Sequence, residues 1–170
     1  MRRILSQLVI EAYGTTPLSS RASRLEEIAP EASAAERVQL GLLPMVLPDL
    51  VRALEQLMVT YDPGAPSRAF ASGLLTYVYN PLDIMPDEDV LGFIDDALIC
   101  ARGLLQLQSE HGVVLESGLV GMCQWALALE GKLDPGLQRR LDAFMENLLQ
   151  SIHQPPDVGL PPESRPGIPL

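Results

Sequence analysis

Apolar residues recur at spacings of three and four along most of the chain, and prolines and glycines divide this pattern into separate segments. Such spacing places apolar side chains on one face of an α-helix. The pattern predicts helices over residues 4–13, 33–43, 48–60, 67–79, 91–105, 115–129 and 137–152. Because no segment with the two-residue period of a strand is long enough to build a sheet, we expect an all-α fold. Its form would be a single bundle of roughly six to seven helices.

Local signals indicate where several of these helices begin. Residues 33–36, Ser-Ala-Ala-Glu, match a capping box. Residues 134–135, Asp-Pro, supply an N-cap followed by proline at the first helical position. Pro48 fits the first turn of another helix, and Ser67 fits the N-cap of the next. Each signal is explained by local backbone geometry, so none of these residues is expected to be catalytic.

Two further features predict how the helices pack. Residues 97–101 are apolar on every side of their helix, which indicates the central and most buried element. Gly118 and Gly121 share a face of their helix, and their small size would let another helix approach closely.

Aromatic residues are scarce at 5%, so the core must be built mainly from aliphatic side chains and methionine, which favours helices.

The chain divides into three parts, although its 170 residues suit one domain. Residues 1–32 are predicted to form an N-terminal helix and a linker. Residues 33–153 form the helical bundle, which contains a hairpin over residues 74–105. Residues 154–170 hold six prolines and are expected to be extended and disordered.

Charge and cysteine usage limit the classes of function. The chain has 12 basic and 22 acidic residues, a net charge of −10, so an acidic surface would repel nucleic acids and anionic lipid head groups. Cys100 and Cys123 lie in apolar helical patterns without a zinc or disulfide spacing, which predicts buried free thiols in a reducing compartment. We therefore expect a cytoplasmic protein, with peripheral membrane association as the second choice.

An unusual group of residues lies between the fourth and fifth predicted helices. Residues 79–87 and 95–96 hold four aspartates and two prolines in an otherwise apolar region. Carboxylates are seldom buried unless they are paired, capped or bound to a cation. The pattern is formed, in order along the chain, by Tyr79, Pro81, Asp83, Pro86, Asp87, Gly92, Asp95 and Asp96.

This ordered pattern resembles that of the YkvA-like family (DUF1232). The resemblance covers about residues 74–105 and implies a proline-bent helical hairpin whose Asp-Asp pair opens the second helix. It implies no established activity, and many relatives are described as membrane-associated. Here, however, residues 87–89 are three acidic residues in succession, which would be costly in hydrocarbon. An aqueous setting is therefore favoured for this chain.

Two interpretations of the aspartates remain open. In the structural one, Asp83 and Asp87 cap a turn and a helix, while Asp95 and Asp96 accept hydrogen bonds from backbone amides or from Tyr79. In the metal-binding one, the same four carboxylates converge on Mg²⁺ or Ca²⁺. Arg102 and Arg68 are alternative counter-charges. We favour the structural interpretation, with no cofactor.

The sequence therefore predicts a non-enzymatic helical protein that serves as a protein-interaction or regulatory module. The expected partner is another protein of unknown identity, nucleic acid is not expected, and self-association is an alternative. A divalent-metal-binding protein, with hydrolysis as a candidate activity, is the second hypothesis. A peripheral membrane protein is the third. His111 and His153 sit at predicted helix ends, so no histidine supports a catalytic set.

Overall fold

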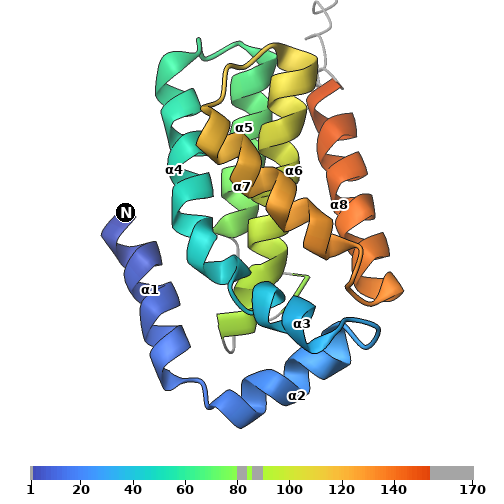
Figure 1. The fold of residues 1–170 in the computed structure, drawn as a ribbon. Helices are drawn as coiled ribbons and strands as arrows, with labels where there is room; N and C mark the ends of the chain where they lie inside the picture. Colours follow the sequence, from blue (N-terminus) through green and yellow to red (C-terminus); the bar gives the residue numbers. More distant parts are fainter. Residues whose placement is uncertain (1, 80–83, 86–89, 154–170) are drawn as a thin grey trace, which may run out of the picture.

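The computed structural model describes residues 2–79, 84–85 and 90–153 (Figure 1). Within these ranges the regular structure is entirely helical, so the predicted all-α bundle is confirmed. The helices are α1 (Arg2–Thr15), α2 (Leu18–Ile28), α3 (Ala34–Leu40), α4 (Leu43–Thr60), α5 (Pro66–Val78), the 3-10 helix η1 (Val90–Gly92), α6 (Phe93–His111), α7 (Ser117–Glu130) and α8 (Pro135–His153). The prediction for the proline-rich residues 154–170 lies outside the described residues.

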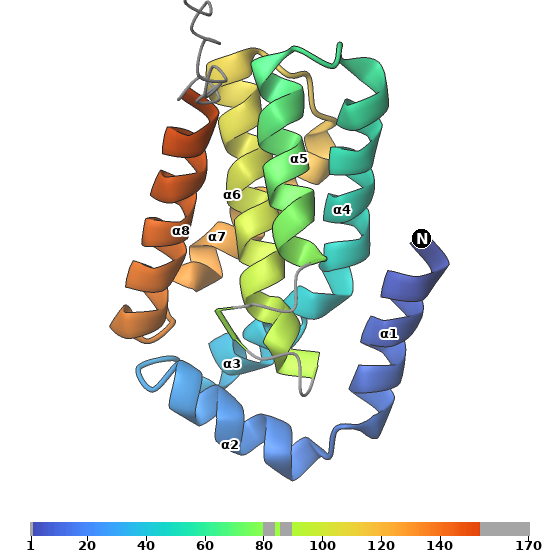
Figure 2. The ribbon, with the colours of Figure 1, turned by 180° about the vertical axis from the view of Figure 1, so that it is seen from behind.

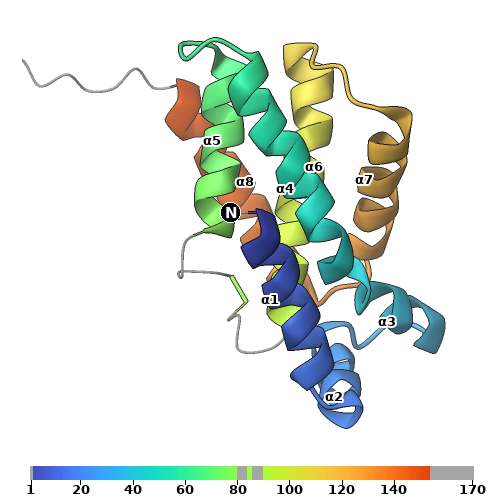
Figure 3. The same ribbon diagram turned by 90° about the vertical axis from the view of Figure 1, so that its left-hand side faces the viewer.

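Helices α4, α5 and α6 stand side by side and form the centre of the bundle (Figure 1). Helix α7 crosses α6 at an oblique angle (Figure 1). Helix α8 packs against α5 and α6 on another side (Figure 2). Helix α1 packs along the first half of α4, and α2 and α3 close the lower end of the bundle (Figure 3). None of the helices that the structure describes has both the length and the apolar character to cross a bilayer.

Helix α6 is the most buried element, as its sequence predicts. Its side chains from Ala97 to Ala101 are all fully buried, because α4, α5, α7 and α8 surround it. Gly112 follows α6 with a left-handed backbone, φ 64°, and ends the helix next to His111. The predicted role of this histidine region as a helix-ending turn is therefore confirmed.

The capping predictions are confirmed for two helices. The hydroxyl of Ser33 accepts a hydrogen bond from the amide of Glu36 at 3.3 Å, and the Glu36 carboxylate accepts one from the Ser33 amide at 2.7 Å. Asp134 Oδ1 accepts hydrogen bonds from the backbone amides of Gly136 and Leu137 at the start of α8, with N···O distances of 2.7 and 3.3 Å. Both helices therefore start where short-range hydrogen bonding dictates.

The predicted starts of α4 and α5 were wrong. Pro48 lies inside α4, which begins five residues earlier with Pro44 in its first turn. The missing amide of Pro48 leaves only the Pro44 carbonyl without its helical bond. Helix α5 begins with Pro66, so Ala65 is the N-cap and Ser67 is a buried residue of the first turn. In both cases an earlier proline starts the helix.

Helix α2 lies in the segment that the sequence assigned to a linker. Its composition is largely polar, and its buried residues are Leu25 and Ile28, near its C-terminal end. Near its beginning, the Arg21 guanidinium lies 4.4 Å above the ring of Tyr13 in α1. Tertiary contacts at both ends therefore stabilise a helix with a weak apolar pattern.

The close helix approaches occur at different glycines from those predicted. A Cβ at Gly118 or Gly121 would meet no atom within 4 Å, so these residues do not mediate packing within the chain. A Cβ at Gly103 in α6 would instead overlap the side chain of Leu74 in α5, which is fully buried. Gly73 in α5 similarly admits Leu148 of α8.

We expect Gly103→Ala to destabilise the protein by about 1–3 kcal/mol, because the added methyl group would overlap several atoms of the fully buried Leu74 side chain. Gly121→Ala is the matched control in an exposed helical position. It should be neutral or stabilising by up to about 1 kcal/mol, since alanine has the higher helix propensity. Urea unfolding of both variants measures the difference. Equal stabilities would contradict the close α5–α6 approach.

Candidate functional site

The carboxylate of Asp95 ties together the two helices of the predicted hairpin. Asp95 lies in the first turn of α6 and is 1% exposed. Its Oδ2 accepts a hydrogen bond from the hydroxyl of Tyr77 in α5 at 2.6 Å. The same oxygen accepts the backbone amide of Met85, in the segment between the helices, at 2.9 Å. A single buried oxygen thus joins the end of α5, the connecting segment and the start of α6.

The Tyr77 hydroxyl extends this contact to the connecting segment. It accepts the amide of Ile84 at 2.9 Å while it donates to Asp95. Burial, followed by the charge of Asp95, raises the pKa of Tyr77 far above its usual value. The tyrosine therefore stays protonated and keeps its donor role. We call Tyr77, Ile84, Met85 and Asp95 the hairpin lock.

Helix α8 covers the hairpin lock from the outside. The ring of Phe144 lies 4.4 Å from the ring of Tyr77, centroid to centroid. Arg140 donates a hydrogen bond from Nη1 to the carbonyl of Ile84 at 3.1 Å. These contacts place α8 over the Tyr77 ring and the Ile84 carbonyl, the two groups next to the buried carboxylate.

The expected hydrogen bond from a backbone amide to Asp95 is confirmed at Met85, and the tyrosine that donates to Asp95 is Tyr77 instead of Tyr79. Tyr79 follows α5 and is 41% exposed, with a hydrogen bond to Glu55. Tyr77 continues the buried stripe of Phe70 and Leu74 at spacings of four and three. That stripe was a usable signal, because a buried tyrosine hydroxyl needs a hydrogen-bond partner.

The structure describes some of the remaining motif residues and leaves others outside its described ranges. Gly92 immediately precedes α6 with an ordinary helical backbone, φ −58°. Asp96 is 1% exposed on the same helix. Pro81, Asp83, Pro86 and Asp87 lie outside the described residues. Their predicted roles as caps, bends or ligands therefore stay predictions.

The metal hypothesis gains no support from the described side chains. Across residues 2–79, 84–85 and 90–153, no group of three or more histidine, cysteine, aspartate or glutamate residues is arranged to hold a metal ion. One oxygen of Asp95 already accepts two hydrogen bonds. The proposed set of Asp83, Asp87, Asp95 and Asp96 includes two residues outside the described part, so Mg²⁺ or Ca²⁺ binding by all four stays a prediction.

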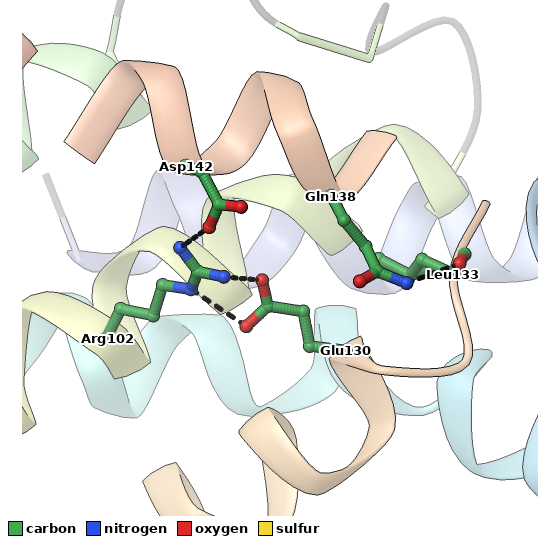
Figure 4. Close-up of polar contacts among 5 residues, drawn as sticks. All are labelled: Arg102, Glu130, Leu133, Gln138 and Asp142. Carbon is green, nitrogen blue, oxygen red and sulfur yellow. Dashed lines mark hydrogen bonds and ion pairs between the residues drawn. The ribbon is translucent and has the colours of Figure 1, made fainter. Parts of the chain in front are cut away.

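The arginines suggested as counter-charges have other partners. Arg68 donates from Nη1 to the carbonyl of Tyr61 at 3.1 Å. Arg102 forms a two-pronged ion pair with Glu130 at the end of α7, and its Nη1 lies 2.7 Å from Asp142 of α8 (Figure 4). The hypothesis that either arginine neutralises the four carboxylates stays a prediction, because Asp83 and Asp87 lie outside the described residues.

Arg102 instead fixes the end of α7 in the bundle. Glu130 is 6% exposed and would be costly to bury without this cation. Just beyond it, the Gln138 side chain donates to the carbonyl of Leu133 at 2.7 Å (Figure 4). The amide of Asp134 donates to the carbonyl of Ile28 at 2.7 Å. The C-terminal end of α7 is thus attached to α6, α8 and α2.

The two cysteines are buried and free, as the sequence predicts. Burial raises the pKa of Cys123 to about 11. Burial, and then the charge of Asp96, raises the pKa of Cys100 well above its usual value. Both thiols therefore stay neutral near pH 7 and act as small apolar side chains.

The first half of α7 diverges from the second half of α4 and leaves a groove of about 960 Å³, which we call the α4–α7 groove. Most of its wall is apolar, and partly buried side chains of α7 such as Leu119 and Met122 form one side. Val59 and Val114 stand at its edge with 87% and 91% of their surfaces exposed. The sequence pattern does not reveal this groove, because the groove arises from the angle between two helices far apart in the chain.

We expect Tyr77→Phe to lower the free energy of unfolding by about 2 kcal/mol, because it leaves the Ile84 amide without its acceptor and removes a donor from Asp95. Tyr79→Phe is the matched control and should cost less than about 0.5 kcal/mol at its exposed position. Urea unfolding gives the two values. Amide hydrogen exchange at Ile84 should be faster only in Tyr77→Phe. A larger loss in Tyr79→Phe would contradict the hairpin lock.

Removal of the Arg102 guanidinium should also destabilise the fold. We expect Arg102→Met to cost about 2–3 kcal/mol, less than a fully buried pair because Arg102 is 25% exposed. The double variant Arg102→Met with Glu130→Met should recover at least half of this loss, since it removes the uncompensated carboxylate. Arg52→Met, which breaks an exposed pair with Asp49, serves as the control and should cost below about 0.5 kcal/mol. Thermal unfolding measures the stability of each variant. A double variant that is no more stable than Arg102→Met would contradict the prediction.

Comparisons of the chain with models of known protein families, with curated proteins and with solved structures give no match. The resemblance of residues 74–105 to the YkvA-like family therefore stays a prediction from the motif. Of the motif residues, Asp95 is part of the hairpin lock, which also contains Tyr77, a residue outside the motif.

Proposed function

We propose that the protein is a non-enzymatic protein-interaction module whose α4–α7 groove binds an amphipathic helix of another protein. The α4–α7 groove is the observation that supports this proposal. A groove between two helices suits a third helix, whose side chains at spacings of three and four can enter it. Val59 and Val114, almost fully exposed at its edge, would each contribute up to about 1.5–3 kcal/mol if covered.

The composition of α7 supports this proposal. Its charged residue is Glu130, which is buried against Arg102, so the solvent-exposed face of α7 carries no charge. Exposed faces of helices in soluble bundles usually carry charged residues. An uncharged exposed face beside an apolar groove is typical of a surface that becomes covered by a partner.

Charge favours a different protein over a second copy as the occupant. Each copy carries a net charge of −10, so self-association brings two strongly acidic molecules together. A heterologous helix has no such penalty. The two buried thiols support a reducing, cytoplasmic setting for this partner.

The hairpin lock supports a structural role for the motif in this module. By fixing α5 to α6, the lock holds the helix on which both walls of the groove, α4 and α7, are packed. Binding surfaces that are rigid before binding lose less conformational entropy on association. The lock would thus preserve the groove without contacting the partner.

A photo-crosslinking amino acid placed at position 114 tests the proposal. We expect it to capture one protein in cells, and the captured segment, identified by mass spectrometry, to form an amphipathic helix. Position 18, where Leu18 is 77% exposed on α2 away from the groove, is the control for nonspecific capture. The synthetic segment should bind the purified full chain at least ten-fold more weakly in Val114→Asp, whereas Leu18→Asp should leave the affinity unchanged. Capture of the same proteins at positions 18 and 114 would refute binding in the groove. So would a synthetic segment that binds the wild type and Val114→Asp with equal affinity.

A further inference from the structure

We infer that the helix received by the α4–α7 groove is basic and runs along the exposed face of α4 for about four turns. This inference rests on the proposed function and specifies the chemistry of its partner. It depends on the order of apolar and charged side chains along one face of α4, and on the charge left uncompensated at the groove.

One face of α4 extends the groove toward the start of the helix. Asp49, Arg52, Gln56 and Val59 line the groove at spacings of three and four, so they share a face. Met45 lies four residues before Asp49 on the same face and is 43% exposed. The face is therefore apolar at both ends and polar in the middle.

The length of this face sets the length of its ligand. From Met45 to Val59 the helix rises about 21 Å at 1.5 Å per residue. A partner helix that contacts both apolar ends needs at least about 14 residues, or four turns. A shorter helix would reach the groove edge at Val59 and Val114 but not Met45.

The charges of the groove favour a cationic ligand. Asp49 and Arg52 form an exposed ion pair at 3.3 Å, so their charges largely offset each other. Glu116, the N-cap residue of α7, is exposed and has no ion pair with any described residue. The groove therefore keeps a negative charge within a chain of net charge −10. A helix with lysine or arginine beside its apolar stripe would be attracted, and an acidic one repelled.

The middle of the face adds a requirement for register. A lysine of the partner can reach Asp49 only by competing with Arg52, whereas Glu116 accepts it without competition. Charged contacts of this kind select the partner and its alignment more than they add affinity. Glu116 is thus the stronger of the two carboxylate contacts.

Three synthetic helices of 18 residues test the inference on the full chain. They share one apolar stripe and differ in their flanking residues, which are lysine, glutamine or glutamate. Fluorescence anisotropy should show at least ten-fold tighter binding of the lysine helix than of the glutamate helix. This preference should shrink as the salt concentration rises from 50 to 500 mM, because salt screens the attraction between the lysines of the helix and the acidic groove. Glu116→Gln should weaken binding of the lysine helix about three-fold or more.

Variants and controls separate the two proposals. Met45→Ser should weaken binding of the 18-residue lysine helix but leave a nine-residue version unchanged. If all three helices bind equally and Val114→Asp abolishes binding, the charge inference fails and the proposed function stands. If none saturates the wild-type chain, both fail. If sedimentation shows a dimer of the chain that Val114→Asp dissociates, a second copy occupies the groove and both are overturned.

Discussion

The buried carboxylate of Asp95 imposes the strictest requirement on this fold. A carboxylate at 1% exposure is costly unless strong donors face it, and the Tyr77 hydroxyl and the Met85 amide supply them. These donors come from two separate parts of the chain, so they can meet Asp95 only if α5 ends and α6 begins at the same level of the bundle. The hydrogen bonds thus fix the relative height of two of the three central helices of the bundle.

The second constraint acts on α7, which is attached firmly at one end. Arg102, Gln138 and the backbone of Asp134 hold its C-terminal end against three other helices. At its other end α7 diverges from α4 and the groove opens. One anchored end and one divergent end make a surface whose shape is set by the angle of α7 on α6.

Sequence reasoning succeeded where the interactions are local. The periodicity of apolar residues located most of the helices, and the caps at Ser33 and Asp134 involve residues two or three positions apart. It failed where two candidates satisfy the same local rule. Tyr77 and Tyr79 both lie at the end of α5, and only their burial distinguishes them.

Other features were beyond local rules altogether. The partners of Arg102 lie 28 and 40 residues away in the chain, so spacing could not identify them. Glycine pairs were equally ambiguous, because a glycine at a close helix contact and one facing solvent look the same in a sequence. Whether a glycine is required at a helix contact depends on the side chain opposite it, which for Gly103 is Leu74.

The all-round burial of α6 has a consequence for the order in which the chain acquires its structure. During synthesis α6 follows α4 and α5, its neighbours in both sequence and space, so these three helices can associate through short-range contacts. Until α7 and α8 are made, the remaining apolar sides of α6 face water. The nascent chain therefore passes through a stage with a large exposed apolar surface, at which aggregation or chaperone binding competes with folding.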